Sequence, residues 1–221
     1  MKAGRNQSGP TSRGIKRNLK KIARVLRLKP LYQQERAGVF EDRWAAIAAS
    51  LGPRDRFLVD VGCNMGNFTA AAAKQGLFAI GIDPMEEAIA RARRLHGKTP
   101  GCGFVFLDVN LDTVRKIPPA DVILCLSVHH YWNRAHGEDG AWKIIGELAD
   151  RSQKLFFEPA SSHRRYGSDV PPFTENDEES IAAYVRAGFA RVAPRHVVTH
   201  VKTTSSINAE NFRSMFLVTR P

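Results

Sequence analysis

Three aspartates follow short apolar runs of the kind that form buried strands. Asp60 precedes a turn that contains Gly62 and Gly66, and Asp83 and Asp108 each end a later run. A carboxylate at the end of the second strand can accept hydrogen bonds from both hydroxyls of a ribose, and glycine lets a ligand approach the backbone closely. The turn lacks the third glycine of the dinucleotide fingerprint. The pattern therefore predicts a nucleoside-binding turn that differs from a dinucleotide site.

A second group of polar residues follows two later apolar runs, as Ser127-Val-His-His-Tyr-Trp-Asn133 and as Glu158-Pro-Ala-Ser-Ser-His-Arg-Arg-Tyr166. Histidine titrates near neutral pH and can act as a base, whereas a guanidinium can hold a phosphate. The candidate catalytic residues are His129 and His130, and the candidate substrate contacts are Tyr131, Glu158, Arg164 and Arg165. The histidines and the arginine pair can equally be solvated surface groups, and the sequence leaves both readings open.

Alternating strands and helices are predicted to position these groups. We expect strands over Phe57–Val61, Leu77–Ile82, Gly103–Leu107, Asp121–Ser127, Lys154–Glu158, Ala190–His200 and Arg213–Thr219. We expect helices over Phe40–Leu51, Phe68–Lys74, Pro84–His96, Glu138–Leu148 and Glu175–Ala187, with Pro84 at a first helical position and Gly188 closing the last helix. The histidine pair is expected on a loop. This alternation predicts an α/β fold with a covered parallel sheet.

The order of the motifs resembles the class I methyltransferases that depend on S-adenosyl-L-methionine (SAM). The matching stretches are Asp60-Val-Gly-Cys-Asn-Met-Gly66, Gly81-Ile-Asp83, Leu107-Asp108-Val109 and Asp121-Val-Ile-Leu-Cys-Leu-Ser127. The resemblance implies a Rossmann-like fold of seven strands, mostly parallel with an antiparallel last strand, and SAM as the cofactor. It implies cofactor contacts by Asp60, Gly62, Cys63, Asn64, Gly66, Asp83, Pro84, Asp108, Val109, Leu126 and Ser127. Arg43 would pair with the methionine carboxylate of SAM, or is a surface arginine.

Further motifs are similar to two narrower groups. Cys125-Leu-Ser-Val-His-His-Tyr-Trp132, His136-Gly-Glu-Asp-Gly140 and Phe156-Phe-Glu-Pro159 are similar to the methyltransferase domains of WbdD-type enzymes, which methylate a terminal phosphate of O-antigen chains. They are also similar to methylphosphate capping enzymes that act on RNA ends. The resemblance implies an O-methyltransferase acting on a hydroxyl or phosphate of a surface-glycan or lipid-linked sugar intermediate. RNA methylation and SAM binding without catalysis are the alternatives.

The positive charge of the chain is concentrated at its beginning. Residues 1–34 hold ten of the 33 Lys and Arg residues and no acid, which leaves 23 basic against 22 acidic residues in the remainder of a chain of net charge +11. We therefore expect a basic arm over residues 1–34 and a methyltransferase domain over residues 35–221. Apolar residues at helical spacing over residues 15–28 predict an amphipathic helix. This helix can bind an anionic membrane surface, grip an RNA backbone or pack on the domain.

The cysteines and the hydropathy pattern suggest the compartment. The three cysteines are an odd number without metal-ligand spacing, so we expect no metal site. No apolar run approaches the length of a membrane span, and no signal peptide is visible. These features predict a reduced, cytoplasmic protein, peripheral at the inner membrane face if the arm binds lipid.

Overall fold

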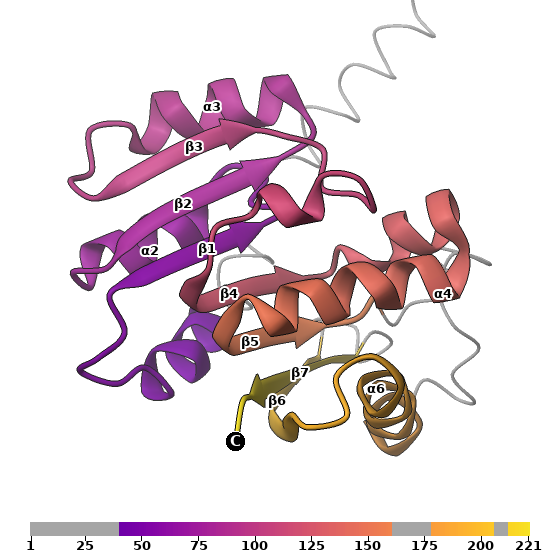
Figure 1. Ribbon diagram of the computed structural model, residues 1–221. Coiled ribbons are helices and arrows are strands. Elements are labelled where there is room, and N and C mark those ends of the chain that lie inside the picture. Colours follow the sequence, from indigo (N-terminus) through magenta and orange to yellow (C-terminus); the bar gives the residue numbers. More distant parts are fainter. Residues whose placement is uncertain (1–39, 161–177, 206–211) are drawn as a thin grey trace, which may run out of the picture. The chain divides into compact units, whose positions relative to one another are not determined.

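A computed structural model of the chain describes residues 40–160, 178–205 and 212–221 (Figure 1). The basic arm, Arg164 and Arg165 lie outside the described residues, so their predictions stand on the sequence alone. The chain divides into two units, Met1–Glu41 and Asp42–Pro221, and the fold below is that of the second. Within the described ranges, no helix has the length and apolarity needed to cross a membrane.

The described part contains one sheet of seven strands in the order β3-β2-β1-β4-β5-β7-β6. The strands are β1 (Phe57–Val61), β2 (Phe78–Asp83), β3 (Cys102–Phe106), β4 (Ala120–Leu126), β5 (Ser152–Glu158), β6 (Val197–Ser205) and β7 (Phe212–Thr219). The pairs among β1 to β5 are parallel, whereas β7 runs antiparallel to both β5 and β6. The predicted α/β fold with an antiparallel last strand is confirmed.

Helices cover both faces of the sheet, which explains why its central strands are apolar without alternation. Val59 of β1 packs in one core with Trp142 of α4 (His129–Asp150) and Phe189 of α6 (Glu178–Val192). Its neighbour Leu58 faces the other side and packs with Ile47, of the helix over residues 40–49, and with Ala72 of α2 (Asn67–Lys74). Figure 1 shows α4 in front of the sheet and α2 behind it. Ligands of such sheets bind at the carboxyl ends of the strands, which here are the ends of β1, β2, β4 and β5.

Two predicted helix ends were wrong. Pro84 precedes the N-cap Met85, so α3 (Glu86–His96) starts two residues later than expected. Gly188 lies inside α6 instead of closing it, and residues 190–192 are helical rather than strand. A Cβ on Gly188 would lie 2.0 Å from Cζ2 of the buried Trp142, so the glycine allows α6 to approach α4 closely.

The histidine pair was wrongly predicted on a loop, because α4 already begins at His129. Gly137, with φ 68° and ψ 174°, interrupts this helix and separates a short first segment from the long second one. Only the second segment carries a clear apolar face in the sequence. The rings of His129, His130 and Trp132 in the first segment are buried in the core. Hydrophobic periodicity over so few residues does not predict such packing.

Candidate cofactor and acceptor site

The turn after β1 requires its glycines. Gly62 and Gly66 have φ values of 75° and 78°, a left-handed region that favours glycine. A Cβ on Gly62 would lie 2.4 Å from Cγ2 of Val128, and one on Gly66 would lie 2.3 Å from the Phe104 ring. The backbone N–H groups of Gly62 and Cys63 donate to the carbonyl oxygen of Ile82 at 2.8 and 3.0 Å. The turn is thereby held against the end of β2.

Asp83 joins this turn to the start of the next connection. Its Oδ2 accepts a hydrogen bond from the backbone N–H of Asn64, and its Oδ1 accepts one from that of Met85, both at 2.9 Å. Each carboxylate oxygen can accept a further hydrogen bond. Asp83 can therefore hold the turn and two ribose hydroxyls at the same time, as the sequence predicted for this position.

Asp60, in β1, and Cys63, in the turn that follows, are both buried. The Asp60 Oδ2 accepts a hydrogen bond from the Thr69 hydroxyl at 2.7 Å. Burial raises the pKa of Asp60 from 3.8 to about 6, although the Thr69 hydrogen bonds oppose the shift. Burial also raises the pKa of the Cys63 thiol, so this cysteine is an unreactive packing group in the turn.

The loop after β3 forms the other side of the expected nucleoside pocket. The Asp108 carboxylate accepts a hydrogen bond from Asn110 Nδ2 at 3.1 Å, and the buried Val109 accepts one at its carbonyl oxygen from Trp132 Nε1 at 2.6 Å. Met85 leaves 58% of its surface exposed next to Asp83. An exposed apolar side chain beside a ribose-binding acid suits the face of an adenine. Met85 was not among the residues predicted from the sequence.

A charged cluster occupies the carboxyl ends of β4 and β5. The Glu158 side chain is completely buried. Arg43 Nη2 donates to its Oε1 at 3.0 Å, and Arg43 Nε lies 2.9 Å from its Oε2. Arg213, at the start of β7, donates from Nη1 to Glu158 Oε1 at 3.2 Å and to the Ser127 hydroxyl at 2.6 Å. The Ser127 hydroxyl donates in turn to Glu158 Oε1 at 2.5 Å. Ser127 has a φ of 60°, an uncommon value for a non-glycine residue.

The cluster contains two of the predicted residues. Arg43, predicted as a cofactor contact, pairs with Glu158, and its guanidinium carbon also lies 5.0 Å from the centre of the Phe68 ring. Glu158 is a buried partner of arginines and is not exposed to an acceptor. Arg213 was missed because 55 residues separate it from Glu158, and only the antiparallel pairing of β7 with β5 brings the two together.

The two histidines lie inside the protein. His129 has no exposed surface and His130 only 2%. The His129 ring lies against Trp142 and Phe157, and its Nε2 is 3.3 Å from the Tyr184 hydroxyl. Burial, together with the neighbouring His130, lowers the pKa of His129 to about 4. A buried His129 of low pKa is better suited to be a neutral packing residue of α4 than to be a base that reaches an acceptor.

Tyr131 and Leu126 complete the predicted set. Tyr131 is 57% exposed on the first segment of α4, its ring centre 3.9 Å from that of His130. Leu126 is the last residue of β4 and pairs in register with Glu158. Among the described residues, no group of three or more His, Cys, Asp or Glu side chains could hold a metal ion.

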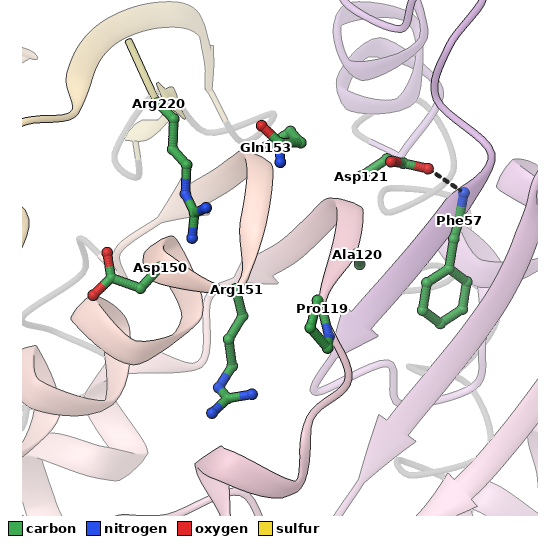
Figure 2. Close-up of a pocket in the computed structure, with 8 residues that line it drawn as sticks. All are labelled: Phe57, Pro119, Ala120, Asp121, Asp150, Arg151, Gln153 and Arg220. Carbon is green, nitrogen blue, oxygen red and sulfur yellow. Dashed lines mark hydrogen bonds between the residues drawn. The ribbon is translucent and has the colours of Figure 1, made fainter.

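A hollow of about 320 Å³ lies at the amino-terminal ends of β4 and β5 (Figure 2). Its lining includes Ala120, Asp121, Arg151 and Arg220, at the starts of β4 and β5 and the end of the chain. The Asp121 carboxylate already accepts hydrogen bonds from the backbone N–H groups of Arg56 and Phe57. Ligands of open α/β sheets bind at the carboxyl ends of the strands, so we place no cofactor in this hollow.

Comparison with known proteins agrees with this geometry. A family model described as "Methyltransferase domain" matches residues 59–148. A curated relative, the O-antigen chain terminator bifunctional methyltransferase/kinase WbdD of Escherichia coli, is 27% identical over 129 residues, which are 57% of this chain and 18% of the relative. The chain therefore spans less than a fifth of the curated relative that it matches.

Solved structures support the same fold. The bifunctional kinase-methyltransferase WbdD has a TM-score of 0.63 at 22% identity, covering 83% of this chain and 39% of that one. The magnesium protoporphyrin IX methyltransferase ChlM of Synechocystis PCC 6803, solved with bound SAM, has a TM-score of 0.60 at 16% identity, covering 84% and 80%. The N-terminal domain of EvdMO1, solved with S-adenosylhomocysteine, has a TM-score of 0.57 at 17% identity, covering 81% and 79%.

Proposed function

Because the chain belongs to the class I SAM-dependent methyltransferases, with SAM as its cofactor, we propose that it methylates an oxygen of a surface-glycan or lipid-linked sugar intermediate. We further propose that this oxygen belongs to a phosphate. The similarity to an O-antigen chain terminator supports the acceptor class. The charged cluster around Glu158 supports the phosphate.

The cluster carries more positive than negative charge among its described members. Two guanidiniums, of Arg43 and Arg213, contact the single carboxylate of Glu158. The Arg43 side chain is 11% exposed, whereas that of Arg213 is 24% exposed. A partly exposed guanidinium that shares its carboxylate with a second arginine can also donate to an anion that binds beside it. Arg213 is therefore the cation that we assign to the acceptor, and Arg43 remains available to the methionine carboxylate of SAM.

The residues fit SAM along the whole carboxyl edge of the sheet. Asp83 retains hydrogen-bonding capacity for the ribose, Met85 presents an apolar surface for the adenine, and Arg43 supplies a cation for the carboxylate. When bound, SAM supplies an electrophilic methyl group on a positively charged sulfur. A phosphate oxygen attacks this methyl carbon as the carbon–sulfur bond breaks towards sulfur, which yields a methyl phosphodiester and S-adenosylhomocysteine.

A phosphate acceptor also fits the burial of the histidines. A hydroxyl acceptor requires a base within reach of its proton, whereas His129 and His130 are enclosed. A phosphate monoester, with its second pKa of about 6, is already largely a dianion at neutral pH. Positioning by Arg213 and the Ser127 hydroxyl is then the main task of the protein.

The basic arm supports an action at a membrane face. Its ten basic residues and its lack of acids suit attraction to anionic lipids, worth about 1 kcal/mol for each basic residue near the surface. We propose that residues 15–28 bring the methyltransferase to the membrane that carries its lipid-linked acceptor.

The proposal is tested by transfer of label from methyl-labelled SAM into separated envelope, RNA and protein fractions of a cell extract. We expect label in the envelope glycan and lipid fraction. Treatment of that fraction with alkaline phosphatase before the reaction should abolish labelling, whereas treatment afterwards should not release the label, because a methyl phosphodiester resists a phosphomonoesterase. Labelling that is insensitive to prior phosphatase would refute the phosphate acceptor. Label in RNA would support RNA methylation instead. The absence of label from every fraction would support a protein that binds SAM without catalysis.

The role of Arg213 has its own control. Arg213→Gln should reduce transfer at limiting acceptor by about tenfold or more, because a charge-assisted hydrogen bond is lost, while the affinity for S-adenosylhomocysteine stays within about twofold. Arg191→Gln is the matched control, since Arg191 is an exposed arginine that pairs with Glu138 and Asp139 on α4. Equal activity of the two variants would remove Arg213 from the acceptor site.

A further inference from the structure

The first segment of α4 touches the cofactor site at two separate places. Val128, at the N-cap of α4, occupies the space above Gly62, where a Cβ would lie 2.4 Å from its Cγ2. One turn later, the indole N–H of Trp132 donates to the carbonyl oxygen of Val109 at 2.6 Å. The segment thus contacts the glycine turn with one residue and the loop after β3 with another.

We infer that Trp132 is a positioning residue, which holds the loop over residues 108–113 in the conformation that receives the adenine of SAM. This inference rests on the proposed function, because it assumes that the adenine of SAM lies against the Asp108 carboxylate and the backbone N–H of Val109. Trp132 is 5% exposed and Val109 is 4% exposed. A buried carbonyl oxygen that loses its donor destabilises the folded protein by about the free energy of desolvating that group. The observed conformation of the loop therefore depends on the indole N–H.

The internal bonds of the loop do not replace this contact. The backbone N–H of Asn110 donates to the Thr113 hydroxyl at 3.0 Å, and the Thr113 N–H donates to Asn110 Oδ1 at 3.2 Å. The Thr113 hydroxyl also donates to the Asp108 carbonyl oxygen, and Asn110 Nδ2 donates to the Asp108 carboxylate. None of these bonds reaches the Val109 carbonyl oxygen, which the indole of Trp132 ties to α4. Without that bond, the buried Val109 carbonyl oxygen loses its donor and the loop loses this tie to α4.

The same short segment also carries the acceptor side of the site. Tyr131, beside Trp132, is 57% exposed, and Gly137 separates the segment from the rest of α4. The segment therefore connects a residue predicted to contact the acceptor with the loop that Trp132 holds.

The test replaces the indole N–H and measures affinity for S-adenosylhomocysteine by calorimetry on the full chain. Trp132→Phe should weaken binding by about 3- to 10-fold, the effect of one hydrogen bond. A second variant carries β-(3-benzothienyl)alanine at position 132, which keeps the shape of tryptophan and lacks the N–H, and should weaken binding similarly without loss of the fold. Trp142→Phe is the control, because Trp142 is equally buried and its N–H donates to Tyr184 instead.

A second ligand separates positioning from a general loss of stability. S-inosylhomocysteine lacks the amino group that the Asp108 carboxylate would accept from. The penalty of Trp132→Phe should therefore shrink to about twofold or less with this ligand. The inference would be overturned if both position-132 variants bound S-adenosylhomocysteine with unchanged affinity. It would also be overturned if Trp132→Phe lost as much affinity for S-inosylhomocysteine as for S-adenosylhomocysteine, or if Trp142→Phe lost as much affinity as Trp132→Phe. If the unaltered protein bound neither ligand, the cofactor site itself would be misplaced.

Discussion

Replacement of Asp83 by asparagine tests the cofactor site most directly. The two carboxylate oxygens of Asp83 accept separate hydrogen bonds, from the backbone N–H groups of Asn64 and Met85. An asparagine has only one oxygen, so its amide N–H₂ would face one of these donors, and one ribose hydroxyl would lose a charged acceptor. A hydrogen bond to a charged group contributes about 1.5–3 kcal/mol, which corresponds to about 10- to 150-fold weaker binding of S-adenosylhomocysteine.

Asp121→Asn is a matched control, because the Asp121 Oδ2 also accepts two backbone N–H groups, from Arg56 and from Phe57. Figure 2 shows the bond from Phe57. Both substitutions should lower the free energy of unfolding by about 1–3 kcal/mol, measured by urea denaturation without ligand. Only Asp83→Asn should weaken binding, measured by titration calorimetry. An unchanged affinity in Asp83→Asn, or an equal loss in Asp121→Asn, would refute the assignment of Asp83 to the ribose.

Three further predictions concern stability and the arm. The folded-state pKa of Asp60 is raised from 3.8 to about 6, so its stabilising protonated form is fully present below pH 4 and is lost as the pH rises through 6. The free energy of unfolding of the unaltered protein, measured relative to that of Asp60→Asn, should thus fall by about 2 kcal/mol from pH 4 to pH 7. A difference that stays constant with pH would contradict the shift. Gly188→Ala should lower the free energy of unfolding by about 2 kcal/mol or more, because its Cβ would overlap the Trp142 ring; a stabilised variant in urea denaturation would contradict that packing. Deletion of residues 1–34 should abolish salt-sensitive sedimentation with anionic vesicles and leave the affinity for S-adenosylhomocysteine unchanged, whereas undiminished sedimentation would exclude the arm.

Several elements were predictable because their cause is local. The bounds of β1 agree with the prediction, since a continuous apolar run that ends at a glycine turn has few other folded forms. The sequence also predicted that Asp60 and Asp83 lie near strand ends, and they are the penultimate residue of β1 and the last residue of β2. The resemblance of the motifs also implied the mostly parallel sheet of seven strands with an antiparallel last strand, which is confirmed.

Other features depend on residues far apart in the chain. Gly188 looks like a helix terminator until the ring of Trp142 is seen where its Cβ would be. His129 and His130 look like exposed bases until α4 turns them into the core. In each case the local pattern is compatible with two environments, and packing between distant segments selects one.

The sequence by itself predicted a nucleoside-binding turn at the end of a parallel sheet, because a glycine turn and a carboxylate lie next to the strands that position them. Only the tertiary structure decided which residues meet at the proposed acceptor site. Arg213 reaches Glu158 and Ser127 through the pairing of β7 with β5, and Trp132 reaches Val109 across the site. Charge and hydrogen bonding act over a few ångströms in space, so separation along the chain does not reveal these partners.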